Sequence, residues 1–188
     1  AARRSGVRVI ELDAAGKPAA LNAGDRVARG FPRIYLDADI VLPPGAVRAL
    51  VEAFERPDAA GRRPLAVVPR RRLDLTGRPL LVRAYYAINA RLPAYDRALF
   101  GRGVIALSAQ GRARFTAFPE VVADDLYLDS LFTRQEKREV PEVVSTVAAP
   151  RRVRDLVRRL IRVRAGNAAL AALAAAGAVA VPVRGSAR

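Results

Sequence analysis

Short apolar runs alternate with amphipathic stretches along the first third of the chain. Residues 7–12 and 33–41 have the composition of short strands, with β-branched and aromatic side chains in runs too short for helices. Residues 18–30 and 44–56 instead place apolar side chains at helical spacing, and each stretch begins at a proline. This strand–helix–strand–helix order is typical of βαβ units, so the pattern predicts an α/β fold in which a sheet is flanked by helices.

The later part of the chain continues this alternation. Strands are expected at residues 65–68, 104–107 and 139–147, and helices are expected to begin at Pro79 and Asp124. The helix after Pro79 has an apolar stripe that we expect to be buried, made of Leu81, Ala84, Tyr85, Ile88 and Leu92.

The pattern changes near residue 150. Residues 153–164 combine an apolar stripe with flanking arginines, as in a basic amphipathic helix, and an Ala/Leu-rich helix is expected after Gly166. The basic helix either lies on an anionic membrane surface or packs on the core with a solvated basic face. We therefore expect an α/β domain at residues 1–150 and a helical tail at residues 151–188.

The composition excludes several kinds of functional site. The 188 residues suit one domain with a substantial core, and they contain no cysteine, which rules out disulfides, thiolate metal sites and a cysteine nucleophile. They contain no histidine either, which rules out imidazole ligands and a histidine general base. Acid–base or metal chemistry must therefore depend on carboxylates, lysine, tyrosine or hydroxyl groups.

The charge is strongly positive, since 33 basic and 18 acidic residues give a formal net charge of +15. Nearly all the cations are arginine, which is typical of GC-rich genomes, and we expect a bacterial, cytoplasmic protein. Such an excess suits phosphate-bearing ligands, nucleic acid or an anionic membrane. The arginines are dispersed and no nucleic-acid module is recognisable, so nucleic acid is not the expected partner. No run is apolar enough to span a membrane, and any membrane contact is expected to be peripheral, at the inner face.

Two regions between the predicted elements contain residues with special properties. Arg70, Arg71 and Arg72 follow a predicted strand, where they form either a solvated turn, which we favour, or a phosphate clamp. Gly101 and Gly103 precede the next strand without the rest of a phosphate-loop pattern. These glycines are expected to permit a turn or a close approach of the backbone.

The clearest chemical signal is the strand that ends at Asp37 and Asp39. Side chains two residues apart leave an extended chain on the same side, so the two carboxylates are expected to lie together. A hard cation such as Mg²⁺ or Mn²⁺ would relieve their repulsion, whereas solvated charges at a strand end are the alternative. In parallel α/β sheets ligands bind beyond the carboxyl ends of the strands, which is where this pair is expected.

Four segments, in this order along the chain, resemble motifs of the inverting family 2 glycosyltransferases of the GT-A fold. They are residues 16–24, 35–39, 118–128 and 159–163. The first two carry the most specific motifs, Gly-Lys-x-x-Ala-Leu-Asn-x-Gly and Asp-x-Asp. The third carries an acidic pair, and the fourth matches the family's Gln-x-x-Arg-Trp element at Arg162 alone. The likeness covers about residues 6–168.

The resemblance implies a three-layer, Rossmann-like GT-A sheet flanked by helices. It also implies metal-dependent transfer of a sugar, with inversion, from a nucleotide diphosphate sugar to an acceptor hydroxyl, on a lipid or polysaccharide. Asp39 is the expected ligand of Mg²⁺ or Mn²⁺, with Asp37 directed toward the metal or the ribose. Asp125 is the expected catalytic base, with Asp124 beside it.

Three further residues receive roles from the same resemblance. Lys17 and Asn22 are expected on the nucleotide-sugar side of the site, where Lys17 would help to hold the diphosphate. Arg162 is expected on the acceptor side or near a phosphate.

The sequence also departs from the family pattern. The strand and helix that hold the nucleotide base in the family have no counterpart before Val7, so we expect this chain to lack that segment and the sheet to be incomplete at its N-terminus. Asp124 replaces the usual Glu, and Arg159 and Val163 replace Gln and Trp. Other classes stay open at this point: a nucleotidyltransferase-like enzyme, a non-catalytic nucleic-acid-binding domain, or an inactive transferase.

Overall fold

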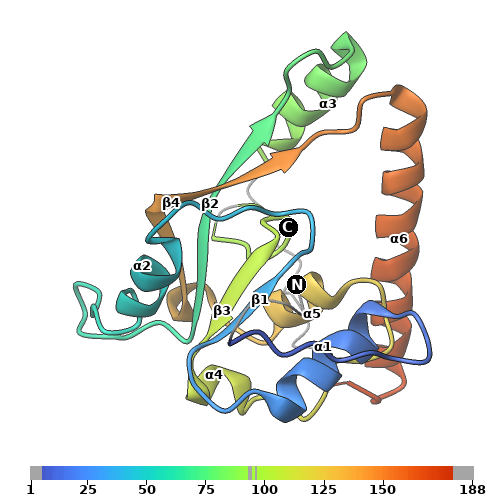
Figure 1. Ribbon diagram of the computed structural model, residues 1–188. Coiled ribbons are helices and arrows are strands. Elements are labelled where there is room, and N and C mark those ends of the chain that lie inside the picture. Colours follow the sequence, from blue (N-terminus) through green and yellow to red (C-terminus); the bar gives the residue numbers. More distant parts are fainter. Residues whose placement is uncertain (1–5, 93–94, 96, 180–188) are drawn as a thin grey trace.

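The computed structural model describes residues 6–92, 95 and 97–179, which form a four-stranded sheet surrounded by helices (Figure 1). In chain order the elements are α1 (Lys17–Val27), β1 (Arg33–Leu36), α2 (Ala46–Glu52), β2 (Ala66–Asp74), α3 (Leu80–Asn89), β3 (Val104–Leu107), α4 (Ala109–Arg112), α5 (Asp124–Ser130), a 3₁₀ turn (Arg134–Glu136), β4 (Lys137–Ala148) and α6 (Val153–Ala175).

The sheet is mixed, with the strand order β1-β3-β2-β4. Strand β3 runs antiparallel to both β1 and β2, while β2 and β4 are parallel. Because β3 is antiparallel to both of its neighbours, β1 and β2 point in the same direction, as the βαβ pattern predicts. Their separation by β3 was not expected, since β3 comes from a later part of the chain.

Helices cover both faces of the sheet, which gives three layers. Alternate side chains of a strand point to opposite faces. Val67 and Ala106 accordingly pack with the fully buried Leu50 of α2, while the neighbouring Ala66 and Ile105 pack on the other face, in the cluster that includes residues of α5 and α6. The α/β fold class predicted from the sequence is therefore confirmed.

Three strand predictions need correction. Residues 7–12 form no strand: Val9 is 50 % exposed, and no strand pairs with this segment in the described part of the chain. Residues 70–72 lie within β2 and not in a turn, because β2 continues to Asp74 alongside β4. The extended segment before Asp37 ends at Leu36, so Asp37 and Asp39 do not lie on one strand.

The helices also differ from the pattern in places. Helix α3 buries Val82 and Tyr86, and it leaves Leu81 and Ile88 exposed by 68 % and 65 %. The predicted stripe of α3 is therefore wrong, because α6 packs on the other side of the helix. Helix α6 also continues through Gly166, where a Cβ would lie 3.4 Å from Ala123, so the expected break is absent.

Helix α6 runs along one side of the molecule (Figure 1). Near its start Leu156 packs with residues of α3, and further along Leu170 joins the cluster that contains residues of α5. The division of the chain at residue 150 stays a prediction, and residues 180–188 of the expected tail lie outside the described residues. Among the described helices, none has the length and apolarity needed to cross a membrane.

Candidate active site

Asp37 lies just beyond the carboxyl end of β1, at a tight turn. Its backbone N–H donates to the carbonyl of Gly103 (2.8 Å), and the N–H of Ile40 donates back to the carbonyl of Asp37 (3.1 Å). Gly103 has a φ of 71°, and a Cβ there would lie 2.3 Å from Cγ1 of Ile40. The close approach expected of the glycine at position 103 is thus confirmed, and it fixes the backbone that carries Asp37.

Lys17, the first residue of α1, connects two acidic residues. Its Nζ lies 2.7 Å from Oδ1 of Asp37 and 2.9 Å from Oδ2 of Asp124. Burial lowers the pKa of Lys17, but the hydrogen bond to Asp37 and the charge of Asp124 outweigh that effect, so the pKa is raised overall. The lysine therefore stays charged and joins the start of α5 to the end of β1.

Asp124 is the most buried carboxylate of the group, with 9 % of its side chain exposed. Burial raises the pKa of Asp124, and the neighbouring charges of Asp125 and Asp37 raise it further, while Lys17 opposes the shift. Asp37 and Asp124 thus contact one ammonium group, and Asp125 adds a further negative charge beside Asp124.

Asp125 is half-buried beside Asp124 and is held by backbone donors. The N–H of Gly101 donates to its Oδ2 (2.9 Å), and the N–H of Leu126 donates to its Oδ1 (2.8 Å). The side chain does not cap a turn of α5, whose N-cap residue is Ala123. The carboxylate is therefore oriented while it keeps lone pairs for a ligand.

One cavity brings these groups together. Lys17, Asp37, Asp124 and Asp125 all line a cavity of about 30 Å³, along with Gly103 and apolar residues of β1, β3 and α5. This volume admits only a few water molecules. The acidic residues at the end of β1 and at the start of α5, far apart in sequence, thus share one hollow.

Asp39 does not line that cavity. It lies in the exposed turn after Asp37, and within the described ranges it forms neither a hydrogen bond nor an ion pair. The expectation that Asp37 and Asp39 leave one extended strand is therefore wrong, because the backbone turns between Asp37 and Ile40.

Asn22 holds the loop before α5 against α1. Its Nδ2 donates to the carbonyl of Phe118 (3.0 Å), and the N–H of Phe118 donates to its Oδ1 (2.8 Å). Both ends of the amide are engaged in this contact, so Asn22 positions the loop that leads to the acidic pair. Its direct contact with a nucleotide sugar stays a prediction.

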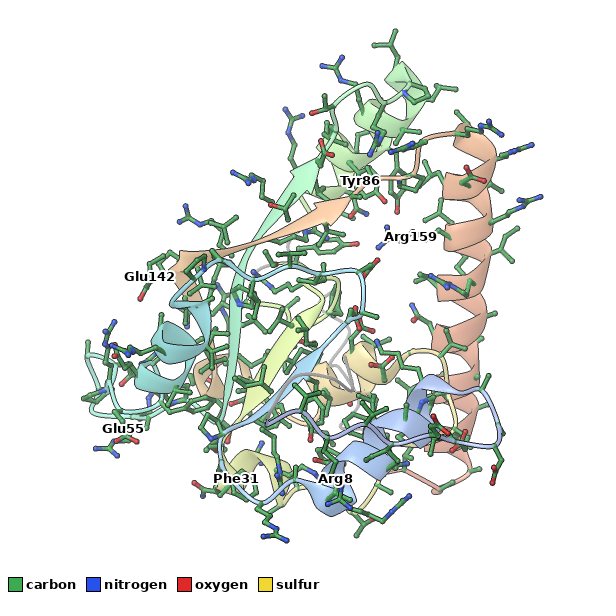
Figure 2. All side chains as sticks on the ribbon, viewed as in Figure 1. Arg8, Phe31, Glu55, Tyr86, Glu142 and Arg159 are labelled. Atoms are coloured by element: carbon green, nitrogen blue, oxygen red, sulfur yellow. The ribbon has the colours of Figure 1, made fainter. Side chains whose placement is uncertain are left out.

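Arg162 is exposed on α6 and does not line the cavity. Arg159, one turn earlier, is half-buried and lies on the side of α6 that faces the sheet (Figure 2). The acceptor-side role of Arg162 stays a prediction. The family element matches this chain at Arg162 alone, so no sequence signal indicates that Arg159 faces the sheet.

A second polar network, which the sequence did not indicate, connects β1 to α1 and α4. Asp25 of α1 accepts hydrogen bonds from the hydroxyl of Tyr35 (3.0 Å) and from Nε of Arg112 (2.7 Å). Burial raises the pKa of the Tyr35 phenol, and the charge of Asp25 adds to that shift. No local pattern indicates these contacts, because they join three elements that are distant in sequence.

The donor set fits a magnesium or manganese ion in its chemistry. In the described residues no three acidic side chains are grouped closely enough to hold a metal on their own. Mg²⁺, however, is usually bound by one or two carboxylates together with substrate phosphates and water. The exposed carboxylate of Asp39 and the neighbouring Asp37 suit that mode of binding.

A mixed sheet with carboxylates beyond the end of β1 defines an α/β domain with an acidic site. The family model for Glycosyl transferase family 2 matches residues 1–102, more than half of the chain. The chain therefore belongs to glycosyl transferase family 2, and its mixed sheet flanked by helices agrees with the GT-A fold expected for that family. No curated protein and no solved structure matches it.

Membership of this family supports sugar transfer, from a nucleotide-sugar donor to an acceptor, as the general chemistry. It favours this chemistry over the nucleotidyltransferase and nucleic-acid-binding alternatives. The matched part contains Lys17, Asn22, Asp37 and Asp39, and it ends before the acidic pair of α5. Asp124 and Asp125 lie outside the matched residues, and the ion pair between Lys17 and Asp124 is what connects them to the matched part.

Proposed function

We propose that this chain provides the catalytic centre of an inverting, divalent-metal-dependent glycosyltransferase that acts on a nucleotide diphosphate sugar. The observation that supports this most is the single cavity lined by Asp37, Asp124 and Asp125 around Lys17. It provides an acidic group at the end of a strand and a separate carboxylate for the acceptor, which are the two parts that such a reaction needs.

The first part concerns the departing diphosphate. Asp39 and Asp37 would hold Mg²⁺ or Mn²⁺. The metal ion would neutralise the negative charge on the leaving group. Asp39 is free of protein partners in the described part of the chain, so its carboxylate is available to a ligand. Lys17 lies beside Asp37 and would bring a second positive charge to the same diphosphate.

The second part concerns the acceptor hydroxyl. Asp125 would accept its proton during attack, a role that contributes about 10²–10⁴-fold in other enzymes. The N–H groups of Gly101 and Leu126 hold the carboxylate in place. Attack from the side opposite the leaving group, with one base, gives inversion at the sugar carbon.

The nucleoside of the donor would bind beside β1, at the unpaired edge of the described sheet. β1 is an edge strand of the described sheet, and a cavity of about 580 Å³ runs beside it, lined by α1, β1 and α2. Val47 and Phe31 are about half exposed along this cavity. A further strand and helix that bind the base, as the family resemblance implies, would fit at this edge.

The acceptor side would lie near a membrane, with a lipid or a polysaccharide as acceptor. On α6 the apolar Val157 and Ile161 are exposed by 48 % and 63 %, between the exposed Arg154, Arg158 and Arg164. An apolar strip between cations is the pattern by which helices bind anionic membrane surfaces from one side. We propose that α6 makes such a peripheral contact at the inner face of the membrane, in the cytoplasm.

The test is a transfer assay on the full-length protein with a panel of nucleotide diphosphate sugars. Asp125→Asn is expected to reduce turnover by at least about 10²-fold, since it removes the base and keeps the shape. Glu120→Gln provides the matched control, because Glu120 is an exposed acid in the loop before α5. Near-normal turnover of Asp125→Asn would refute the assignment of the base.

A further inference from the structure

Arg71, on β2, is a half-buried cation without a carboxylate partner in the described residues. Its guanidinium lies over the ring of Tyr95, with Cζ 5.0 Å from the ring centre. The adjacent Arg72 differs, because it is exposed and donates to the hydroxyl of Thr146 at 3.0 Å. Charges that are removed from water are normally paired, whereas the half-buried Arg71 has an aromatic ring and no described carboxylate beside it.

The groups around Arg71 make its charge less favourable. Burial lowers the pKa of Arg71, and the positive charges of Arg102 and Arg159 lower it further. Arg102 is satisfied by Glu139 and by the carbonyls of Ala98 and Pro69.

Arg159 reaches toward the sheet from α6 and, like Arg71, has no ion pair among the described residues (Figure 2). Two guanidinium groups from different elements therefore repel one another, and no carboxylate of the described residues pairs with either of them.

Arg71 lies next to the proposed base. A Cβ on Gly101 would be 3.2 Å from Nη1 of Arg71, and the N–H of the same glycine donates to Oδ2 of Asp125 at 2.9 Å. One glycine therefore separates the guanidinium of Arg71 from the carboxylate. Gly101 has a φ of 69°, which favours glycine, and a larger side chain would crowd the guanidinium of Arg71.

We propose that Arg71 and Arg159 form a phosphate-binding site for an acceptor that carries a phosphate group near its reacting hydroxyl. Guanidinium groups bind phosphate through paired, charge-assisted hydrogen bonds, and an anion between them would remove their mutual repulsion. Arg71 and Asp125 both lie beside Gly101, so this phosphate site is close to the proposed base. The donor diphosphate is instead assigned to Asp37, Asp39 and Lys17. The assignment of the ligand as an acceptor rests on the proposed function. The assignment of a phosphate rests on the placement of Arg71 over Tyr95 and beside Gly101, and on the inward orientation of Arg159 (Figure 2).

The test measures binding of sn-glycerol 3-phosphate, a small alcohol with a phosphate monoester, by ³¹P NMR line broadening. Arg71→Gln and Arg159→Gln are each expected to weaken binding about tenfold or more, since each removes a charged donor. Arg72→Gln is the matched control, because it removes the same charge from the next residue of β2, and it is expected to bind as the wild type does. The variants lie on different elements, so a folding defect in one leaves the other informative.

UDP serves as the second probe and separates the two sources of phosphate. Its binding is expected to be unchanged in Arg71→Gln and Arg159→Gln. An equal loss of UDP binding would show that the pair holds the donor diphosphate and would overturn the acceptor assignment. Absence of broadening in the wild type, or equal binding by all variants, would overturn the site itself.

This binding measurement uses no donor sugar and no turnover. A failure of the transferase proposal in the Asp125→Asn assay would therefore leave the glycerol phosphate result intact, and the reverse holds as well.

Discussion

The ammonium nitrogen of Lys17 lies 2.9 Å from Oδ2 of Asp124, and these residues begin helices α1 and α5. The contact joins the part of the chain that matches the family to an acidic pair outside the match. The same ammonium lies 2.7 Å from Asp37. Lys17 is thus the point at which the two halves of the proposed site meet.

Replacing Lys17 by alanine is expected to reduce transfer at least about tenfold, because Asp37 and Asp124 would then face each other without a cation. The pKa of Asp124 is expected to rise further, since burial raises it and Lys17 opposes that shift. Steady-state kinetics and an NMR titration of the Asp124 carboxyl measure the two effects. Lys17→Arg should restore part of both, and an unchanged titration of Asp124 in Lys17→Ala would contradict the contact.

A Cβ at Gly103 is expected to disturb the turn that carries Asp37. It would lie 2.3 Å from Cγ1 of Ile40 and 3.6 Å from Oδ2 of Asp37, at a φ of 71°. Gly103→Ala should lower the free energy of unfolding by about 1–3 kcal/mol. Gly24→Ala, in the interior of α1 with open space around it, should instead stabilise by about 0.5–1 kcal/mol. Urea denaturation compares the variants, and equal effects would contradict the described turn.

Glu136 is expected to stabilise the fold in a pH-dependent manner. Its hydrogen bond with Arg114 lowers the pKa of the carboxyl from 4.5 to about 2, and bonds from Thr133 add to this effect. A depressed pKa stabilises the fold above the ordinary value, and that stabilisation is lost as the pH falls toward 2. Glu136→Gln should therefore be less stable than the wild type at pH 7, with a difference that shrinks between pH 4.5 and 2.

Thermal unfolding across this pH range checks the prediction for Glu136. Glu120→Gln, which removes an exposed acid, should show no such convergence with the wild type. A difference for Glu136→Gln that stays constant from pH 7 to 2 would show that the ion pair with Arg114 does not contribute.

Membrane contact through α6 predicts co-sedimentation with vesicles of phosphatidylcholine and phosphatidylglycerol at low salt. Ile161→Gln should reduce the bound fraction without loss of stability, because Ile161 is 63 % exposed. Val41→Gln changes an even more exposed apolar residue, far from α6 in the chain, and should bind as the wild type does. Salt should weaken binding, since it screens the arginines. Equal sedimentation with pure phosphatidylcholine vesicles would contradict the role of charge.

Local patterns predicted the elements near the site well. The apolar run before Asp37 and the proline at the start of α1 gave the positions of β1 and α1, because both depend on neighbouring residues. The acidic pair at the start of α5 was also placed correctly. The α/β class followed from the order of these elements.

Contacts between distant segments were beyond such reasoning. The buried face of α3 depends on where α6 packs, and periodicity alone favoured Leu81 and Ile88 over Val82 and Tyr86. The turn after Asp37 depends on the approach of Gly103, the residue before β3, so the prediction of an extended Asp37–Asp39 pair was wrong. The surroundings of Arg71 likewise come from segments distant in sequence, around Tyr95 and Gly101.

The proposed role of Asp39 is tested most directly by Mn²⁺-dependent binding of nucleoside diphosphates to the full-length protein. We predict that Asp39→Asn loses this metal-dependent binding, while Asp125→Asn retains it and loses transfer. Glu55→Gln, a change in an exposed acid paired with Arg63, should leave both properties intact. If Asp39→Asn bound nucleoside diphosphate and Mn²⁺ as well as the wild type, and Asp125→Asn transferred sugar normally, the proposed roles of both residues would be contradicted.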